Sequence, residues 1–529
     1  MPTRRNFIRA GATALTALAL RPIHRLSRAN HLLLRGARVI DGTGAGAFAA
    51  DVALQDGRIM AVGARVTLPG AEEIDLRGLV LAPGFVDLHS HADSLMDADP
   101  MVESGIRQGI TTAIVGQDGN FRPELAEWFG RLEELRPAVN VGSMVGLGSV
   151  RGRIVGAADR AATPEELARM VALVERSVEA GACGASTGLE YTPGGFARQD
   201  ELIALCRPLA RRRLPYATHM RNEDDRLLEA IDEAVAVARG AGCPVEISHL
   251  KAQGPRNWHK MQTALDRIEA AEQDGIDAAF DIYPYIAYQT GLTNLFPLWS
   301  RDGGSDLFLR RLEDPTQSDR IRTETLAKVD LIGGWNNVLI ASVAQGDRSI
   351  EGQRLGDAAA AKEQEPYDFA VALLRESKGQ VGMVGFGMNE EKVELGLRHR
   401  LAIVASDGVA VALAGPARRG HPHPRSLGTF PRVLGRYVRE RKTLELEDAI
   451  RKMTSRPAER VRLLDRGRIA VGLAADLVAF DPETVIDRAT FQEPFQYPDG
   501  IRLVVVNGEV VLRDGERTPA RPGRVVRPA

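Results

Sequence analysis

The chain has 529 residues, a formal net charge of −2 at pH 7 and 44% hydrophobic residues. This balance excludes the broad basic surface with which proteins bind nucleic acids or anionic membranes. Three cysteines without Cys-x-x-Cys spacing exclude a disulfide framework, and we expect Cys183, Cys206 and Cys243 to be small buried residues. A chain of this length suits a barrel of about 250 to 400 residues with accessory pieces, and the expected partner is a small molecule.

The first 29 residues have the pattern of a twin-arginine export signal. Arg4 and Arg5 precede an uncharged run over residues 10–20. That run is too short to span a bilayer permanently. The sequence therefore predicts a signal peptide over residues 1–29, a periplasmic or secreted location, and no permanent membrane span.

Short β-prone segments occupy both ends of the remaining chain. Residues 30–82 contain three of them, with the Asp56-Gly57 hairpin signal in the middle one. Residues 463–529 contain a matching set, with Asn507-Gly508 as a second hairpin turn. We expect the two ends to build one small β-sandwich.

Between these ends, several β-prone runs finish in a histidine or a carboxylate. The first run ends in His89 and His91, whose side chains point the same way in an extended segment. Later runs end at His219, His249 and Asp407. Helical patterns at 165–178 and 225–239 lie between such runs. This alternation predicts a (β/α)8 TIM-like barrel over residues 83–462, in which the strand ends converge on one rim.

One stretch of the predicted barrel is too long for the elements it must contain. Residues 300–379 are polar and irregular, and they predict an inserted subdomain. Such an insertion either covers the barrel mouth and shapes substrate choice, or is a neutral surface addition. Residues 380–386 resemble the next barrel strand.

With these residues assembled, the chain resembles the amidohydrolase superfamily and, within it, the N-acyl-D-amino-acid deacylases (D-aminoacylases). The resemblance extends from about residue 32 to residue 527. Its most specific motifs span residues 82–91, 186–194, 218–221, 247–252, 281–285, 406–408 and 423–432. The resemblance implies a zinc-dependent hydrolase that releases a carboxylate and a free D-amino acid from an N-acyl-D-amino acid.

Two positions depart from this family's pattern. Asp118 stands where the family usually has a metal-binding cysteine, and Leu147 stands where a histidine is typical. No lysine precedes Lys251 and no cysteine precedes Cys183, so any bridging ligand must be a carboxylate. Asp118 is the first choice for it and Glu190 the second.

The predicted metal ligands are the four histidines together with a carboxylate. His219, His249 and Asp118 would form the tighter site, and His89 with His91 a second one, for one or two Zn²⁺ ions or other divalent metals. Asp407 is the predicted general base and acid, taking a proton from the attacking water and returning it to the leaving amine.

The substrate is expected to carry a free carboxylate. Lys251, two residues after His249, is a predicted contact, and the family resemblance implies that Tyr191, Tyr283 and Arg425 contact the substrate as well. Preference for the D-stereoisomer is implied by the resemblance alone.

Three other functions remain open at this stage. A dipeptidase acting on a C-terminal D-residue needs the same metal and carboxylate contacts. A cyclic amidohydrolase is disfavoured because the bridging lysine of that type is missing. A catalytically inactive periplasmic binding protein is suggested by the two departures. No sequence feature specifies an oligomeric state.

Overall fold

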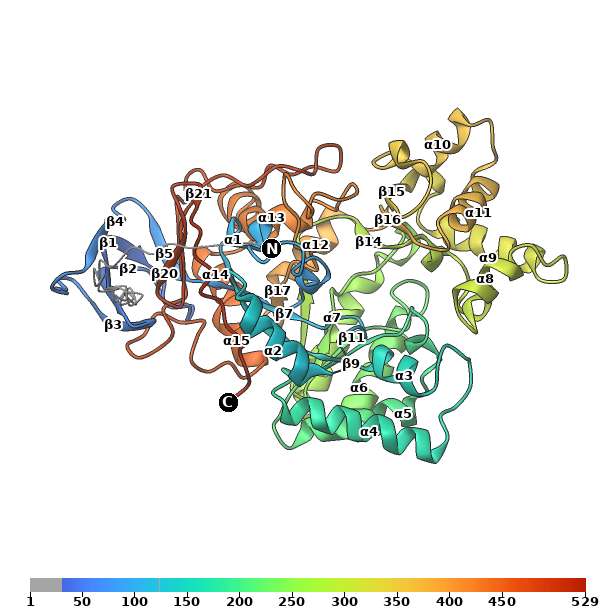
Figure 1. The fold of residues 1–529 in the computed structure, drawn as a ribbon, viewed down its shortest axis with the longest axis horizontal. Helices are drawn as coiled ribbons and strands as arrows, with labels where there is room; N and C mark the ends of the chain where they lie inside the picture. The colour runs from blue at the N-terminus through green and yellow to red at the C-terminus, as the bar shows by residue number, and fades with distance from the viewer. Residues whose placement is uncertain (1–30, 123) are drawn as a thin grey trace, which may run out of the picture.

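The computed structural model describes residues 31–122 and 124–529, and its centre is a ring of parallel strands (Figure 1). A three-stranded and a six-stranded sheet share one extended run, β8–β9, so together they supply eight strand positions. In chain order the strands are β6 (Phe85–Asp87), β7 (Ile110–Val115), β8 (Asn140–Ser143), β9 (Val145–Gly146), β10 (Ala185–Gly188), β11 (Tyr216–His219), β12 (Val245–Ile247), β13 (Ala278–Ile282) and β17 (Ala402–Val404).

The ring closes just beyond the ends of its first and last strands. An isolated parallel bridge joins Ser90, after β6, to Gly408, after β17. The helices around the ring are α2 (Leu125–Leu135), α3 (Leu147–Ile154), α4 (Pro164–Glu179), α5 (Gln199–Ala210), α6 (Leu227–Ala241), α7 (Lys260–Gln273), α12 (Glu390–Arg398), α13 (Arg425–Arg432), α14 (Leu446–Met453) and α15 (Ser455–Arg460). The predicted α/β fold with a (β/α)8 TIM-like barrel is confirmed.

Local sequence explains the two helices predicted from periodicity, α4 and α6. Thr163 caps α4 with its side chain, Glu166 completes a capping box, and Pro164 occupies the first turn. Gly242 ends α6 with a left-handed backbone at φ 75°. Both helices bury an apolar face, and this packing fixes the strand ends in place.

Both ends of the described chain join a single nine-stranded sheet beside the barrel (Figure 1). Its strands are β1 (Leu32–Val39), β2 (Phe48–Gln55), β3 (Arg58–Gly63), β4 (Glu72–Asp75), β5 (Val80–Pro83), β18 (Leu477–Phe480), β19 (Ile501–Val506), β20 (Glu509–Arg513) and β21 (Glu516–Arg517). The two parts meet where β5 pairs with β18. Both predicted hairpin turns are present, since Asp56 and Asn507 have left-handed backbones, each followed by a left-handed glycine.

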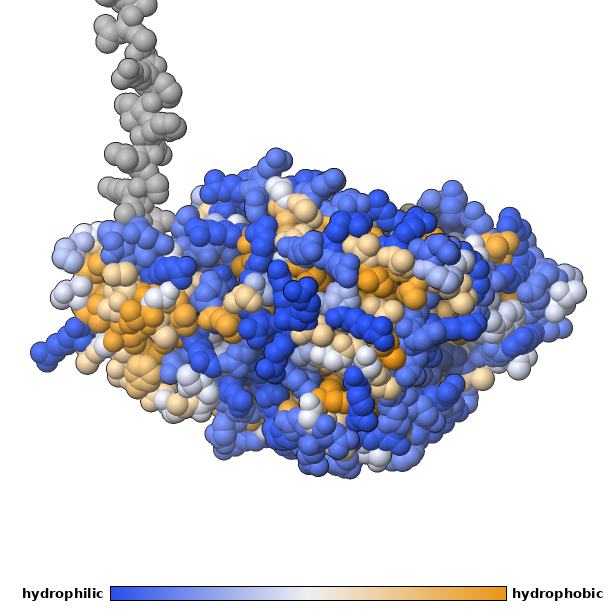
Figure 2. Space-filling view, turned by 90° about the horizontal axis from the view of Figure 1, so that it is seen from below, coloured by the Kyte–Doolittle hydropathy of each residue, from blue (hydrophilic) through white to orange (hydrophobic). Residues whose placement is uncertain are grey.

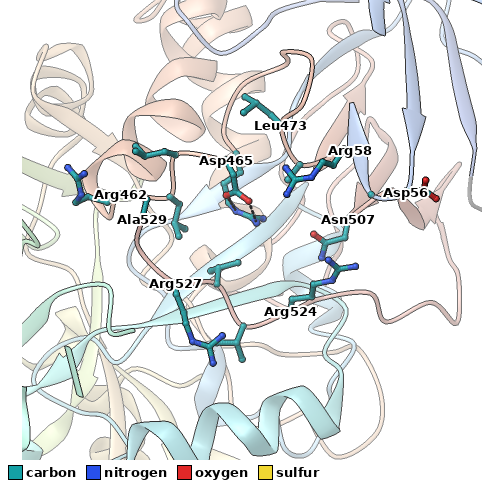
Figure 3. A pocket seen from close by; sticks show the side chains of 16 residues that line it. Asp56, Arg58, Arg462, Asp465, Leu473, Asn507, Arg524, Arg527 and Ala529 are labelled. Atoms are coloured by element: carbon teal, nitrogen blue, oxygen red, sulfur yellow. Dashed lines mark hydrogen bonds and ion pairs between the residues drawn. The ribbon is translucent and has the colours of Figure 1, made fainter. Parts of the chain in front are cut away.

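A polar cavity of about 540 Å³ lies where this sheet, the end of the barrel and the C-terminal segment meet (Figure 3). It is lined by Arg58 from the β2–β3 hairpin and by Arg524 and Arg527 from the C-terminal segment. The C-terminal segment is held against the barrel because Val526 N–H donates to the Val141 carbonyl at 2.9 Å. The cavity is therefore part of the seam between the two units.

The insertion forms its own three-stranded antiparallel sheet and helices, away from the nine-stranded sheet (Figure 1). Its elements include β14 (Tyr288–Gly291), α8 (Ser305–Arg311), α9 (Ser318–Leu331), β15 (Val338–Val343), α10 (Leu355–Ala361), α11 (Pro366–Glu376) and β16 (Val381–Gly385). The prediction that residues 380–386 form a barrel strand is wrong. They form β16, which pairs with β14 and β15, because the barrel's eight positions are already filled.

The surface over the nine-stranded sheet has an apolar area (Figure 2). Phe48 on β2 and Met60 on β3 are 43% and 49% exposed. Within residues 31–122 and 124–529, no helix combines the length and apolar character needed to cross a bilayer. The predicted export signal lies outside the described residues. Cys183, Cys206 and Cys243 are buried and free, as expected.

Candidate functional site

The strand ends bring together six of the predicted site residues at one mouth of the barrel. Asp118 follows β7 and His249 follows β12, whereas His219 is the last residue of β11. The other three, His89, His91 and Asp407, follow β6 and β17. These residues are distant in sequence and meet because the strands are parallel.

One group of possible metal ligands consists of His89, His91, Asp118 and Asp407. Their ligand atoms all lie within 4.8 Å of one another. His91 Nε2 lies 3.1 Å from Asp407 Oδ1 and 3.4 Å from Asp118 Oδ2. His89 Nε2 lies 3.5 Å from Asp118 Oδ1.

A second group consists of Asp118, His219 and His249, so Asp118 belongs to both. His249 Nε2 lies 3.5 Å from Asp118 Oδ1 and 3.0 Å from His219 Nδ1. Glu190 lies beside this group, with Oε2 3.6 Å from His219 Nε2, but is not a member of it. The geometry thus favours Asp118 over Glu190 as the shared ligand, and the metal-binding role of each residue stays a prediction.

Backbone geometry holds three of these side chains at the mouth. Asp118, His249 and Asp407 have left-handed backbones, with φ of 53°, 37° and 49°. Residues with side chains rarely adopt this conformation, and it commonly marks functional sites. The segments after β6 and β17 are also tied together, since Asp407 N–H donates to the His89 carbonyl at 2.8 Å.

Unpartnered buried atoms at the site fit a metal ion. His89 Nε2, Asp118 Oδ1 and His219 Nε2 are buried and have no hydrogen-bond partner in the part of the chain that the structure describes. Leaving such atoms unsatisfied costs about 1–3 kcal/mol each. Imidazole nitrogens and a carboxylate oxygen are donors that zinc and similar divalent cations accept, so the residues present fit such an ion.

A comparison with protein-family models matches two stretches of the chain, residues 72–298 and 336–512, to the model described as "Amidohydrolase family". The gap between them falls within the insertion. The chain belongs to the amidohydrolase family.

Relatives of this amidohydrolase include deacylases of N-acyl-D-amino acids. It is 36% identical to the N-acyl-D-glutamate deacylase of Alcaligenes xylosoxydans xylosoxydans over 94% of this chain and 96% of that protein. A crystal structure of N-acyl-D-glutamate deacylase from Bordetella bronchiseptica, complexed with zinc and a phosphonate inhibitor, has a TM-score of 0.81 at 32% identity. It covers 94% of this chain and 99% of that one.

A second solved relative is a D-aminoacylase, whose structure was described in terms of the functional role of its binuclear metal centre. Its TM-score to this amidohydrolase is 0.79 at 33% identity, covering 93% of this chain and 99% of that one. These likenesses extend over the sheet, the barrel and the insertion together.

The residues predicted to contact substrate surround the two ligand groups, but both cations among them are already paired. Lys251 Nζ lies 2.7 Å from Glu223 Oε1, and Arg425 Nη1 lies 2.7 Å from Asp407 Oδ2. Tyr191 Oη lies 3.4 Å from His219 Nδ1. The Tyr283 ring lies under Arg425, with the guanidinium carbon 4.8 Å from its centroid. Their substrate contacts stay predictions.

Charge interactions dominate the ionisation of the site. Burial raises the pKa of Asp407, but Arg425 and His89 outweigh it and hold that pKa well below its usual range. Burial lowers the pKa of His91, but Asp118 and Asp407 outweigh it and raise the pKa to about 9. Asp407 therefore remains ionised, and His91 carries a proton at neutral pH in the metal-free protein.

Three residues that the sequence analysis did not assign support the site. Glu223 is buried and accepts hydrogen bonds from Lys251 and from Gln253, and its Oε1 lies 3.0 Å from His249 Nδ1. Asp281, in β13, accepts a bond from the His249 backbone N–H at 2.8 Å.

Lys328, in α9 of the insertion, is the third supporting residue. It pairs with Asp224, and its Nζ lies 3.8 Å from Glu190 Oε1. Glu223 lies four residues after His219, and this short spacing from a predicted metal ligand is a sequence signal that could have pointed to it. Lys328 lies in a polar segment with no motif, so no sequence signal points to it.

Leu147, the second departure from the family pattern, and His423, in the motif at residues 423–432, are both buried. Leu147 is buried at the first position of α3 and packs in the main core. His423 is fully buried, and its Nε2 lies 3.0 Å from the Ala287 carbonyl. Burial and Arg425 hold the pKa of His423 well below its usual range, so it is a neutral structural residue.

Proposed function

We propose that this amidohydrolase uses zinc to hydrolyse the amide bond of N-acyl-D-amino acids, giving a carboxylate and a free D-amino acid. The observation that carries the proposal is the pair of ligand groups sharing Asp118 at the barrel mouth. Its support is the 36% identity to an N-acyl-D-glutamate deacylase along nearly the whole chain.

Zinc would be held by the histidines and Asp118 of the two groups, with Asp407 beside them. When bound, zinc polarises an amide carbonyl and acidifies water, so that a nucleophile is available at neutral pH. The buried imidazoles exclude bulk water and hold the reacting groups in fixed positions.

Asp407 moves the proton in this mechanism. Its Oδ1 faces His91 and its Oδ2 faces Arg425, so the carboxylate is held ionised and in one orientation. Asp407 accepts the proton of the attacking water and delivers it to the amine nitrogen as the C–N bond breaks. One carboxylate thereby serves as both base and acid.

Arg425, Lys251, Tyr191 and Tyr283 provide the cations and hydroxyls that a substrate α-carboxylate requires. The Tyr283 hydroxyl is buried and has no hydrogen-bond partner among residues 31–122 and 124–529, so it could donate to a ligand. A substrate carboxylate would share Arg425 with Asp407.

The test is the release of free amino acid from paired N-acetyl-D and N-acetyl-L amino acids by zinc-loaded protein, with chelated protein as the control. We expect chelator-sensitive release from the D series alone. Release from D-configured dipeptides but from no acetylated amino acid would replace the deacylase with a dipeptidase. No release from any substrate would favour an inactive binding protein.

We also propose that the protein is exported to the periplasm or secreted, on the basis of Arg4 and Arg5 and the uncharged run over residues 10–20. The test is cell fractionation of the wild type beside a variant with both arginines replaced by lysine. Export of the wild type alone is expected. Equal cytoplasmic retention of both proteins would contradict the proposal.

A further inference from the structure

The two ligand groups contain nitrogen and oxygen donors and no sulfur. The chain's only cysteines are Cys183, Cys206 and Cys243, and none of them belongs to either group. Sulfur donors select thiophilic cations, whereas carboxylate donors suit harder cations such as Mn²⁺. The identity of the shared ligand therefore affects which metal the site prefers.

Asp118 faces histidines of both ligand groups. Its Oδ2 lies 3.4 Å from His91 Nε2, whereas its Oδ1 lies 3.5 Å from the Nε2 atoms of both His89 and His249. Two donors about 2.1 Å from one cation in a tetrahedral arrangement lie about 3.4 Å apart. Each Asp118 oxygen is thus spaced from a histidine nitrogen as two ligands of the same ion are spaced.

The turn that carries Asp118 is closely packed. Asp118 Oδ1 is buried and has no hydrogen-bond partner among the described residues, and the left-handed backbone of Asp118 is followed by Gly119, whose own φ is 78°. A Cβ on Gly119 would lie 2.9 Å from the Gly188 nitrogen, so β10 packs directly against this turn. Close packing on this side restricts movement of the Asp118 backbone.

We propose that Asp118, which belongs to both ligand groups, determines the metal preference of this site by bridging two cations. The oxygen bridge lets Mn²⁺ occupy the site beside Zn²⁺, which a cysteine at this position would disfavour. The inference rests on the metal site of the proposed function, but not on catalysis.

The experiment measures metal binding without substrate. Metal-free protein is equilibrated with Mn²⁺, Co²⁺ or Zn²⁺, bound metal is counted by mass spectrometry, and affinities come from competition with a metallochromic indicator. The variants are Asp118→Cys and Asp118→Asn. Asp97→Cys is the control, because it adds a thiol at an exposed carboxylate that pairs with Arg122 and Arg131 on the surface.

The wild type should bind two cations per chain, and Asp118→Asn at most one. In Asp118→Cys the ratio of the Mn²⁺ to the Zn²⁺ dissociation constant should rise at least about tenfold, and its Co²⁺ form should gain a thiolate-to-cobalt absorption band. Asp97→Cys should match the wild type.

A wild type that binds one cation would overturn the inference, and so would two cations retained in Asp118→Asn. An unchanged metal ratio in a folded Asp118→Cys protein would also overturn it. If Asp118→Cys does not fold, the numbers of cations bound by the wild type and by Asp118→Asn still test the inference. A protein that binds two cations but hydrolyses nothing would overturn the proposed function and leave this inference standing.

Discussion

At the scale of single residues, the site is a set of ionised carboxylates and imidazoles held in place by buried partners. Arg425 pairs with one oxygen of Asp407, and Glu223 lies against the far nitrogen of His249. Partners of this kind fix the orientation of a ligand or base and so decide how well it works. Replacing Asp407 tests the proposed proton carrier, and replacing Glu223 tests a residue that supports His249.

Replacing Asp407 with Asn should remove the proton acceptor while keeping the shape of the side chain. We expect kcat on an N-acetyl-D-amino acid to fall by about 10²- to 10⁴-fold, with metal retained at Asp118, His219 and His249. Steady-state kinetics with metal analysis on the same sample checks this. Turnover within about tenfold of the wild type would remove Asp407 from the proposed mechanism.

Replacing Glu223 with Gln should weaken metal binding. The neutral amide no longer supports His249 as a carboxylate does, and it leaves Lys251 without its charged partner. We expect zinc affinity to fall by about 10- to 100-fold, measured by competition with a chelating indicator. Glu233→Gln is the control, since Glu233 pairs with Arg221. Equal affinities in the two variants would contradict the supporting role of Glu223.

At the scale of elements, the insertion contributes directly to the neighbourhood of the site. Lys328 of α9 reaches Asp224 and approaches Glu190, both on the barrel. Burial raises the pKa of Glu190, but Lys328 outweighs it and lowers the pKa to about 2. The insertion therefore stabilises a buried carboxylate at the barrel mouth.

Replacing Lys328 with Met should destabilise the fold by about 1–3 kcal/mol, because Asp224 and Glu190 lose their cation. Urea unfolding measures the change. Lys392→Met is the matched control: Lys392 pairs with the exposed Glu391, so its loss should cost less than about 1 kcal/mol. Equal losses in both variants would show that Lys328 is an ordinary surface lysine.

Sequence patterns predicted the barrel because each strand end carries a polar residue and each helix an apolar face. His219 and His249 could be found this way, and Asp118 through the family resemblance. The misplacement of residues 380–386 has a physical cause, since an apolar strand has the same pattern in any sheet. Neither the pairing of Lys251 with Glu223 nor the approach of Lys328 could be predicted, because both depend on contacts between distant segments.

At the scale of the whole molecule, a metal bound at His91 would displace its proton, so we expect stability to depend on both metal and pH. The pKa of His91 in the folded protein is about 9, above the ordinary histidine value of 6.5. Without metal, the protonated His91 stabilises the fold fully below about pH 6.5. That contribution is lost as pH rises toward 9.

The stabilisation by zinc should therefore grow between pH 6.5 and 9, because zinc replaces a proton that leaves over this range. Thermal unfolding of metal-free and zinc-loaded protein across this range measures the difference in Tm. His91→Asn should flatten the dependence. A difference that shrinks as pH rises would contradict the account.

The most direct test of the central claim is a zinc titration of metal-free protein during hydrolysis of N-acetyl-D-glutamate, followed by the release of D-glutamate. For the wild type, the account predicts no turnover without metal and turnover that rises to saturation as zinc is added. When His249 is replaced by Asn, it predicts no turnover at zinc concentrations that saturate the wild type. Equal turnover in metal-free and zinc-loaded protein would contradict the assignment of this site to metal-dependent amide hydrolysis.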